Sequence, residues 1–205
     1  MRTDADRRDP LPGMTELDRK AFGKALDAMM SVYAAAMHVP AIQLPGRRAI
    51  MESHVINPAF RAFVVTAPAG DSHRLKIVGF AYGFRGGQGQ WWHDMVRSAL
   101  LISYGPTTAG DWLDDSFEVA ELHVHPEYQQ RGHGTSLLYR LTAQRPERTA
   151  VLSTMDSESP ARRLYRSLGF ADLLTGYRFS GGNEAYAVMG AALPLSRPRP
   201  PSPRY

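Results

Sequence analysis

Apolar residues recur every four positions near the start of the chain, which is the spacing of one face of a helix. The residues of this stripe are Leu17, Ala21, Ala25, Met29, Tyr33 and Met37. Thr15, followed three residues later by Asp18, resembles a capping box, so the pattern predicts a helix that begins at Thr15. A shorter helix is expected over residues 47–55. Apolar runs at residues 62–65 and 75–84 predict two strands, separated by a Pro-Ala-Gly-Asp turn.

The most informative pattern covers residues 117–170. Residues 117–124 alternate as a strand, with Ala120, Leu122 and Val124 on one face and Phe117, Val119, Glu121 and His123 on the other. The first half is apolar on both faces, which indicates a strand inside a sheet. The second half becomes polar on one face, as expected where a strand reaches a site.

Alternating helices and strands follow this strand. We expect a helix from about residue 132 to 145, a strand at 150–154, and a second helix capped by Ser159, with Pro160 at its first position and Gly169 at its end. The apolar face of this second helix is expected to be Ala161, Leu164 and Leu168.

The order of these elements predicts the fold class. Two further strands, at 173–179 and 186–191, complete an α/β fold in a single domain, with a mixed, mostly antiparallel central sheet flanked by helices. The domain is expected to span residues 15–193, with an atypical insert at 86–115 that contains a helix over 91–101. Residues 1–14 are expected to be a disordered lead-in, and the proline- and arginine-rich residues 194–205 a disordered tail.

Composition narrows the choice of function. The 205 residues contain no cysteine, which excludes a disulfide scaffold, a thiolate zinc site and a cysteine nucleophile. The formal net charge is +4, but Arg197, Arg199 and Arg204 lie in the tail, which leaves +1 for the rest. We therefore expect no nucleic-acid partner. There is no apolar leader and no run near the roughly 18 residues of a membrane span, so we expect a cytoplasmic protein with no membrane partner.

A glycine-containing loop, Gln129 to Thr135, joins the buried strand to the following helix. Glycines there let the backbone turn tightly and approach a ligand, and the free N–H groups of the first helical turn favour an anion such as a pyrophosphate. Arg131 adds a positive charge. The loop lacks the Gly-Lys-Ser/Thr of a P-loop, and Leu137 stands where a dinucleotide fingerprint has its third glycine. A plain helix-entry turn is the alternative.

Two motifs give the chain a family resemblance. Residues 122–134, Leu-His-Val-His-Pro-Glu-Tyr-Gln-Gln-Arg-Gly-His-Gly, resemble the central motif of the GCN5-related N-acetyltransferase (GNAT) family. About 30 residues later, Ala161, Leu164-Tyr165 and Gly169-Phe170 resemble its second signature. The resemblance implies an acyl-CoA N-acyltransferase-like fold. It also implies transfer of the acetyl group of acetyl-CoA to a primary amine by direct attack in a ternary complex.

The resemblance also implies roles for particular residues. The backbone of residues 122–124 would pair with the pantetheine arm, the loop would hold the pyrophosphate, and Tyr165 would protonate the departing thiolate. The implied cofactor-binding residues are Leu122, His123, Val124, Gln129, Gln130, Arg131, Gly132, His133, Gly134, Thr135, Ser159 and Tyr165. Many family members have asparagine where this chain has Glu158, so Ser157 or Ser159 would have to supply that polar contact.

The reaction needs a neutral amine, yet an alkyl amine is only about one part in 2,500 neutral at pH 7. Glu121 is the expected base, and His123, two residues on and on the same face, could relay the proton or replace it. The alternatives are an ion-paired carboxylate and a packing histidine. Glu118 lies on the opposite face, and His125 before Pro126 is expected to be structural. His123 and His125 lack an obvious third ligand, so no metal is expected.

The sequence leaves the acceptor open between a small-molecule and a peptide amine. The acidic residues Asp111, Asp114, Asp115 and Glu118 either attract a cationic amine or form a solvated loop. Trp91 and Trp92 are either a lid or core residues. A homodimer is left open. The alternative functions are a non-catalytic acyl-CoA-binding module or sensor, and a domain whose proline-rich tail docks a partner.

Overall fold

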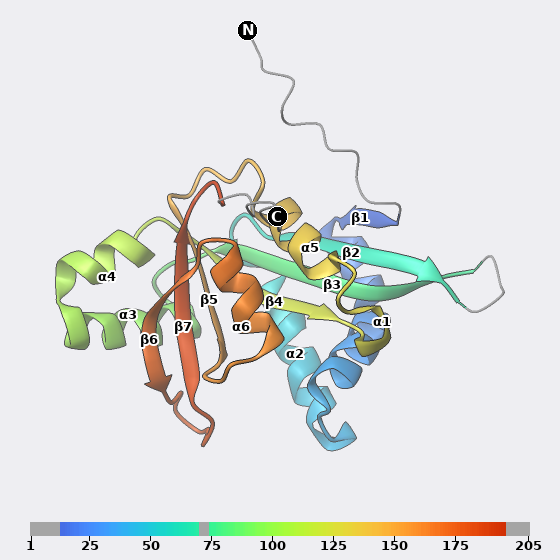
Figure 1. Ribbon diagram of the computed structural model, residues 1–205, viewed down its shortest axis with the longest axis horizontal. Helices are drawn as coiled ribbons and strands as arrows, with labels where there is room; N and C mark the ends of the chain where they lie inside the picture. The colour runs from blue at the N-terminus through green and yellow to red at the C-terminus, as the bar shows by residue number, and fades with distance from the viewer. Residues whose placement is uncertain (1–12, 70–73, 196–205) are drawn as a thin grey trace, which may run out of the picture. The chain divides into compact units, whose positions relative to one another are not determined.

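The structure is a computed structural model that describes residues 13–69 and 74–195 (Figure 1). The expected lead-in up to residue 12, and the tail from residue 196, lie outside the described residues. The strands are β1 (Met14–Leu17), β2 (Arg61–Pro68), β3 (Leu75–Arg85), β4 (Ser116–Val124), β5 (Thr149–Met155), β6 (Ala171–Tyr177) and β7 (Tyr186–Ala192). They hydrogen bond in the order β1-β2-β3-β4-β5-β7-β6.

The helices of the described chain are α1 (Arg19–Met37), α2 (Leu44–His54), α3 (Trp91–Tyr104), α4 (Pro106–Leu113), α5 (His133–Thr142) and α6 (Pro160–Ser167). Two short 3₁₀ turns, η2 (Ala41–Gln43) and η3 (Pro126–Tyr128), complete the elements. None of the helices that the structure describes combines the length and the apolar character that a membrane crossing requires.

The sheet is mixed and mostly antiparallel, as predicted. β4 and β5 pair in parallel, with Ser116 opposite Thr149 and Glu118 opposite Val151. The pairs β1–β2, β5–β7 and β6–β7 are antiparallel. The α/β fold class predicted from the sequence is therefore confirmed.

Contacts group the described residues into two compact units. The first unit comprises residues 13–56, 60–69, 74–82 and 121–141, and the second comprises 57–59, 83–120 and 142–195. The long strands β3 and β4 each contribute residues to both units.

In the first unit, the buried residues of α1 differ from the predicted stripe, of which they include only Met29; they are Phe22, Leu26, Met29, Met30 and Val32. The Phe22 ring meets those of Phe60 and Tyr82 edge-on at 5.0 and 5.2 Å. Asp18 caps α1 by accepting a hydrogen bond from the Ala21 N–H at 2.7 Å. The prediction that this helix begins at Thr15 is wrong, because residues 14–17 form β1 and pair with β2. A four-residue strand is too short for its alternating period to stand out against the helical repeat that follows.

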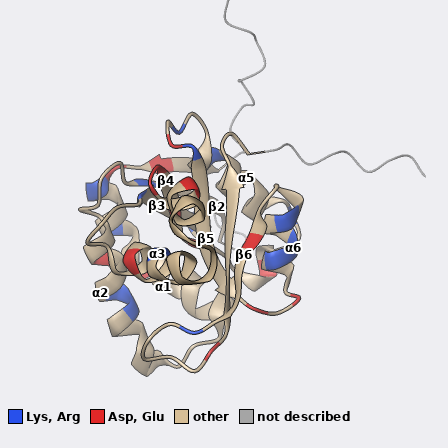
Figure 2. Ribbon diagram, turned by 90° about the vertical axis from the view of Figure 1, so that its left-hand side faces the viewer, with Lys and Arg blue, Asp and Glu red and all other residues tan. Residues whose placement is uncertain are grey.

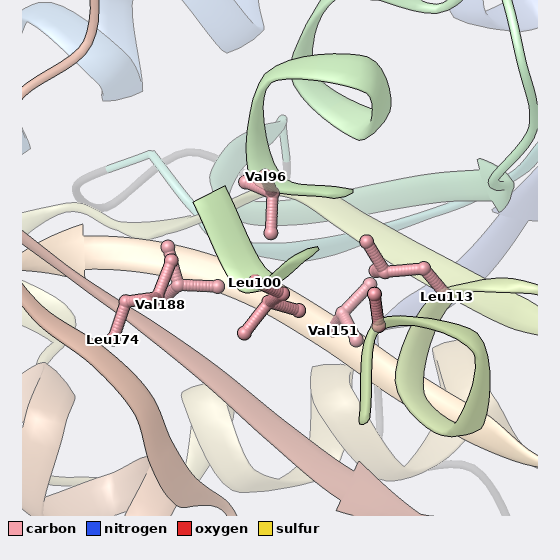
Figure 3. Close-up of a cluster of buried hydrophobic side chains, with 7 residues drawn as sticks. Val96, Leu100, Leu113, Val151, Leu174 and Val188 are labelled. Carbon is pink, nitrogen blue, oxygen red and sulfur yellow. The ribbon is translucent and has the colours of Figure 1, made fainter. Parts of the chain in front are cut away.

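In the second unit, apolar side chains from α3, α4 and three strands form one cluster (Figure 3). The labelled members are Val96, Leu100, Leu113, Val151, Leu174 and Val188. Both α3 and α4 come from the insert, of which the sequence predicted only the first helix. Trp92 packs against this cluster and donates its indole N–H to Ser153 at 3.1 Å, whereas Trp91 is exposed and lies beside Phe179. Trp92 is thus a core residue.

Candidate functional site

Glu121 and His123 meet at the end of β4, in the first unit. His123 Nε2 lies 2.5 Å from Glu121 Oε2, and the Glu121 side chain is only 3% exposed. Strand alternation explains this, since residues two apart project from the same face. The predicted juxtaposition of the two side chains is confirmed.

Arg47 of α2 joins this pair. Its Nη2 donates a hydrogen bond to Glu121 Oε1, and its guanidinium lies over the Tyr33 ring, 5.4 Å from the centroid. Sequence reasoning missed Arg47, which is 74 residues away from Glu121 in the chain. The available signal was its position four residues before the fully buried Met51, on the same helix face.

Charge and burial oppose each other at Glu121. Burial alone would raise the pKa of the Glu121 carboxyl. The hydrogen bond and charge of His123 and the charges of Arg47 and His54 together lower it by more than burial raises it, so the pKa lies below its usual value. Burial lowers the pKa of His54, whose Nδ1 lies 3.0 Å from the Tyr82 hydroxyl. The site therefore holds an ionised Glu121 carboxylate, and the histidine whose pKa is lowered is His54.

Aromatic rings enclose His123 on two sides. The Tyr33 ring stands edge-on to the imidazole at 5.0 Å, and the Phe80 ring lies tilted at 5.4 Å. The histidine side chain is 11% exposed. The imidazole is thus held in one orientation and shielded from most solvent.

The loop after β4 has the backbone geometry expected of a tight turn. Gln130 and Gly132 have φ angles of 59° and 81°, in the left-handed region. The Gln129 side-chain amide donates to the Val124 carbonyl at 3.0 Å, and Arg131 Nη2 donates to the Glu127 carbonyl at 2.9 Å. These bonds fix the loop between the strand and α5.

The loop fits an anionic ligand. A Cβ built on Gly132 would meet no atom within 4 Å, so the space at the loop is open. His133 Nδ1 is buried without a hydrogen-bond partner in the described structure, and burial and Arg131 lower the pKa of that histidine. The first N–H groups of α5 have no acceptor within the helix. Backbone and side-chain donors are thus available where the sequence predicts a pyrophosphate site.

His125 has a structural place beside this loop. Its backbone N–H donates to the Val78 carbonyl at 2.8 Å, and its Nδ1 accepts from the Glu127 N–H at 3.4 Å. The ring caps the first turn after β4, in agreement with the prediction of a structural role. No set of three or more His, Cys, Asp or Glu side chains suited to a metal ion occurs among the residues that the structure describes.

Tyr165 and Ser159 belong to the second unit. Ser159 caps α6 by accepting from the Arg162 N–H at 3.2 Å, which confirms its capping role. Tyr165 is 6% exposed, and its ring lies 5.8 Å from that of Phe170. The second signature therefore begins at a capped helix and includes a buried tyrosine.

The buried face of α6 differs from the predicted apolar one. Leu168 is buried, but Ala161 and Leu164 are only partly so, and Arg162 is buried instead. Arg162 pairs with Asp156 and, at 3.0 Å, with Asp172. Hydrophobicity alone placed the arginine outside, whereas two carboxylates compensate its charge inside.

Figure 2 shows the arginine positions of α6 in blue on its ribbon. Glu158, which stands where the family resemblance leads us to expect asparagine, pairs with Arg166 at 2.7 Å, and its carbonyl accepts from Arg163 at 3.1 Å. The departure at this position thus serves an ion pair on the helix surface.

Two of the four acidic residues that could attract a cationic amine have partners within the second unit. Asp115 pairs with Arg85 at 2.9 Å and Asp114 with Arg97 at 3.2 Å, while Glu118, within β4, is buried. The charges of Asp114 and Asp115 are thus balanced, so attraction of a cationic amine would depend mainly on Asp111.

Residues 72–172 match the family model described as an acetyltransferase (GNAT) domain. The chain is 42% identical over 131 residues to a GCN5-like protein acetyltransferase of Mycobacterium tuberculosis, an alignment that covers 62% of this chain and 64% of that protein. The chain thus spans less than two thirds of this curated relative.

Solved structures share the fold. The ribosomal-protein-S18-alanine N-acetyltransferase of Escherichia coli matches 90% of this chain and 95% of its own, with a TM-score of 0.58 at 19% identity. YncA of Salmonella typhimurium, solved with its cofactor acetyl-CoA, matches 94% of this chain and 99% of its own, with a TM-score of 0.55 at 18% identity. The resemblance predicted from the sequence is confirmed over residues 72–172, which match an acetyltransferase domain of the GNAT family.

Proposed function

We propose that the protein is an N-acetyltransferase that moves the acetyl group of acetyl-CoA to a primary amine by direct attack. The observation that carries the proposal is the buried, hydrogen-bonded Glu121–His123 pair on the strand that leads into the Gln129–Thr135 loop. The acceptor class is a small-molecule or peptide amine. The M. tuberculosis relative is named a protein acetyltransferase, so a peptide amine is the first acceptor to test.

In this proposal the loop holds the pyrophosphate of acetyl-CoA. The N–H groups of residues 130–135 and the Arg131 charge would bind its oxygens, and the backbone of Leu122, His123 and Val124 would bind the pantetheine arm. The bound acetyl-CoA supplies a thioester carbonyl for attack and a thiolate as leaving group. An N–H near Val124 is our candidate donor to the oxyanion.

We propose that His123, in place of the Glu121 that the sequence predicts as base, takes the proton from the amine. The two carboxylate oxygens of Glu121 are engaged, one by Arg47 and the other by His123. An ionised carboxylate only accepts hydrogen bonds, so Nε2 of His123 carries a hydrogen, and in the neutral imidazole Nδ1 keeps its lone pair. Deprotonating a lysine-like amine at pH 7 requires roughly 4.6 kcal/mol, and a positioned base typically contributes about 10²–10⁴-fold.

We propose that Tyr165 donates the proton to the leaving thiolate. Its buried phenol at the second signature is the feature that supports this role. Tyr165→Phe should then lower kcat about 10²-fold or more, with the affinity for acetyl-CoA retained. An unchanged kcat between pH 6 and 9 would remove Tyr165 from the mechanism.

The cofactor site is tested by thermal unfolding of the full chain with and without acetyl-CoA. At about 100 times Kd, a ligand of the native state adds roughly 2.7 kcal/mol, a Tm rise of about 5–10 °C for a domain of this size. Gly132→Val should abolish the rise, because a β-branched residue strains a left-handed backbone. Gly89→Val is the matched control, since Gly89 also has a positive φ and open space around its Cα.

Product formation separates an enzyme from a binding module. The thiol released from acetyl-CoA is measured against a panel of small-molecule amines and peptide amines. Release with acetylated product supports the transferase. A Tm rise without release from any acceptor would favour the acyl-CoA-binding module instead.

A further inference from the structure

We propose that Arg47 is a positioning residue for proton removal: by pairing with Glu121 it keeps that carboxylate ionised, and thereby keeps the His123 hydrogen on Nε2 and the lone pair on Nδ1. The inference rests on the proposed function, because it assigns a task within the same site. Arg47 is outside both family motifs and outside the matched residues 72–172.

The Glu121 carboxylate lies between two donors, one at each of its oxygens. Arg47 Nη2 donates to Oε1 and His123 Nε2 lies at Oε2. If Glu121 were protonated, its own O–H would donate to Nε2, and the imidazole hydrogen would move to Nδ1. Nδ1 of His123 would then be a hydrogen-bond donor, although the reaction needs an acceptor at this atom.

Among the described groups that act electrostatically on Glu121, Arg47 carries the one permanent charge, and the others are the imidazoles of His54 on α2 and His123 on β4. Tyr33 on α1 and Tyr82 on β3 place their phenols near Arg47. Burial lowers the pKa of His54, so it is neutral at pH 7. A guanidinium remains charged throughout the working range of pH.

Glu121 and His123 share one hydrogen bond, so a proton added to either group changes the state of both. With one proton more than the active state, the pair is either a protonated imidazole beside a carboxylate or a neutral imidazole beside a carboxylic acid. Neither form accepts a proton from the amine at Nδ1. The positive charge of Arg47 disfavours the extra proton in both forms, so its removal must move the titration of the pair to higher pH.

Arg48, the next residue of α2, provides a matched control. It also pairs with two carboxylates, Asp27 and Glu52, but both of these are exposed. Arg48→Gln removes the same charge from the same helix without touching Glu121. It should leave the pH profile and kcat unchanged.

The test is the pH dependence of kcat/KM for acetyl transfer by the full chain. Arg47→Gln should move the acidic limb up by about one to three pH units, so that activity lost at pH 7 is largely regained at high pH. Arg47→Lys, which restores the charge, should return the limb most of the way. The proposal would be overturned if the acidic limb of Arg47→Gln lay at the wild-type pH. It would also be overturned if the folded variant lost the same fraction of kcat/KM at every pH.

A second readout does not depend on activity. The ring protons of His123, identified by comparison with His123→Gln, are followed by NMR as a function of pH in wild type and Arg47→Gln. The midpoint should rise in Arg47→Gln and not in Arg48→Gln. If no amine is acetylated but this midpoint rises, the proposed function fails while the coupling of Arg47 to the pair stands; an unchanged midpoint contradicts the coupling itself.

Discussion

Among the residues that the structure describes, two buried glutamates, one in each unit, pair with an arginine in different surroundings. Glu121 gives one oxygen to Arg47 and the other to His123. Glu147 gives both oxygens to Arg145, at 2.6 and 2.9 Å, and its side chain is fully buried. One oxygen of Glu121 is therefore left to accept from the His123 ring, whereas both oxygens of Glu147 accept from the same arginine.

The partners of the two arginines extend this contrast. The Arg145 guanidinium lies 4.4 Å from the Phe117 ring and donates to the Ala59 carbonyl at 3.3 Å, so it joins separate segments of the second unit. Arg47 has a buried Nε without a hydrogen bond and a side chain that is 33% exposed, against 10% for Arg145. We infer that the Glu147–Arg145 pair stabilises the fold. The Glu121–Arg47 pair, which has one oxygen bonded to His123, is the one that can take part in proton transfer.

The largest expected effect on stability is at the second pair. Glu147→Gln leaves Arg145 buried without a counter-charge, and we expect a loss of about 3–5 kcal/mol in the free energy of unfolding. Urea unfolding measures this loss. The kcat of the molecules that remain folded should equal that of wild type, and a stable variant would show that Phe117 and Ala59 suffice to hold Arg145.

The same substitution at the first pair should have a smaller effect on stability. Glu121→Gln leaves Arg47 partly in contact with water, so we expect about 1.5–3 kcal/mol at pH 7. The pKa of Glu121 is lower in the folded than in the unfolded protein. Its stabilisation is therefore present above about pH 4.5 and is lost as the pH falls through the folded value.

Urea unfolding of wild type and Glu121→Gln at pH 7, 5 and 3 follows that loss. The difference between the two proteins should narrow toward pH 3. A constant difference would mean that the carboxylate is not preferentially ionised in the folded state.

The sequence predicted one half of this comparison better than the other. Strand alternation was enough to place Glu121 beside His123, because a period of two fixes both side chains on one face. Arg47 could not be assigned, since its pairing depends on how α2 lies against β4 and not on any local spacing. Arg162 was missed in the same way, because an arginine is buried only when distant carboxylates compensate it.

Local signals explain what else succeeded and failed. Ser159 and Pro160 marked the start of α6 because capping is a local hydrogen bond and proline fixes one dihedral angle. The sequence predicted only one of the two helices of the insert. The helix α3 has an amphipathic pattern, but α4 is eight residues long and begins at Pro106 directly after Gly105, a dipeptide that suggests a loop. β1 was assigned to a helix because β-pairing with β2 overrode the local pattern.

The central claim is that the Glu121–His123 pair performs the proton transfer of an acetyltransferase. The most direct measurement is the rate of acetylated-amine formation from acetyl-CoA by wild type, His123→Gln and Glu147→Gln, each at a temperature where it is folded. We predict that His123→Gln loses about 10²–10⁴-fold in kcat while acetyl-CoA still raises its Tm, and that Glu147→Gln keeps the wild-type kcat. A His123→Gln variant with wild-type kcat would contradict the account.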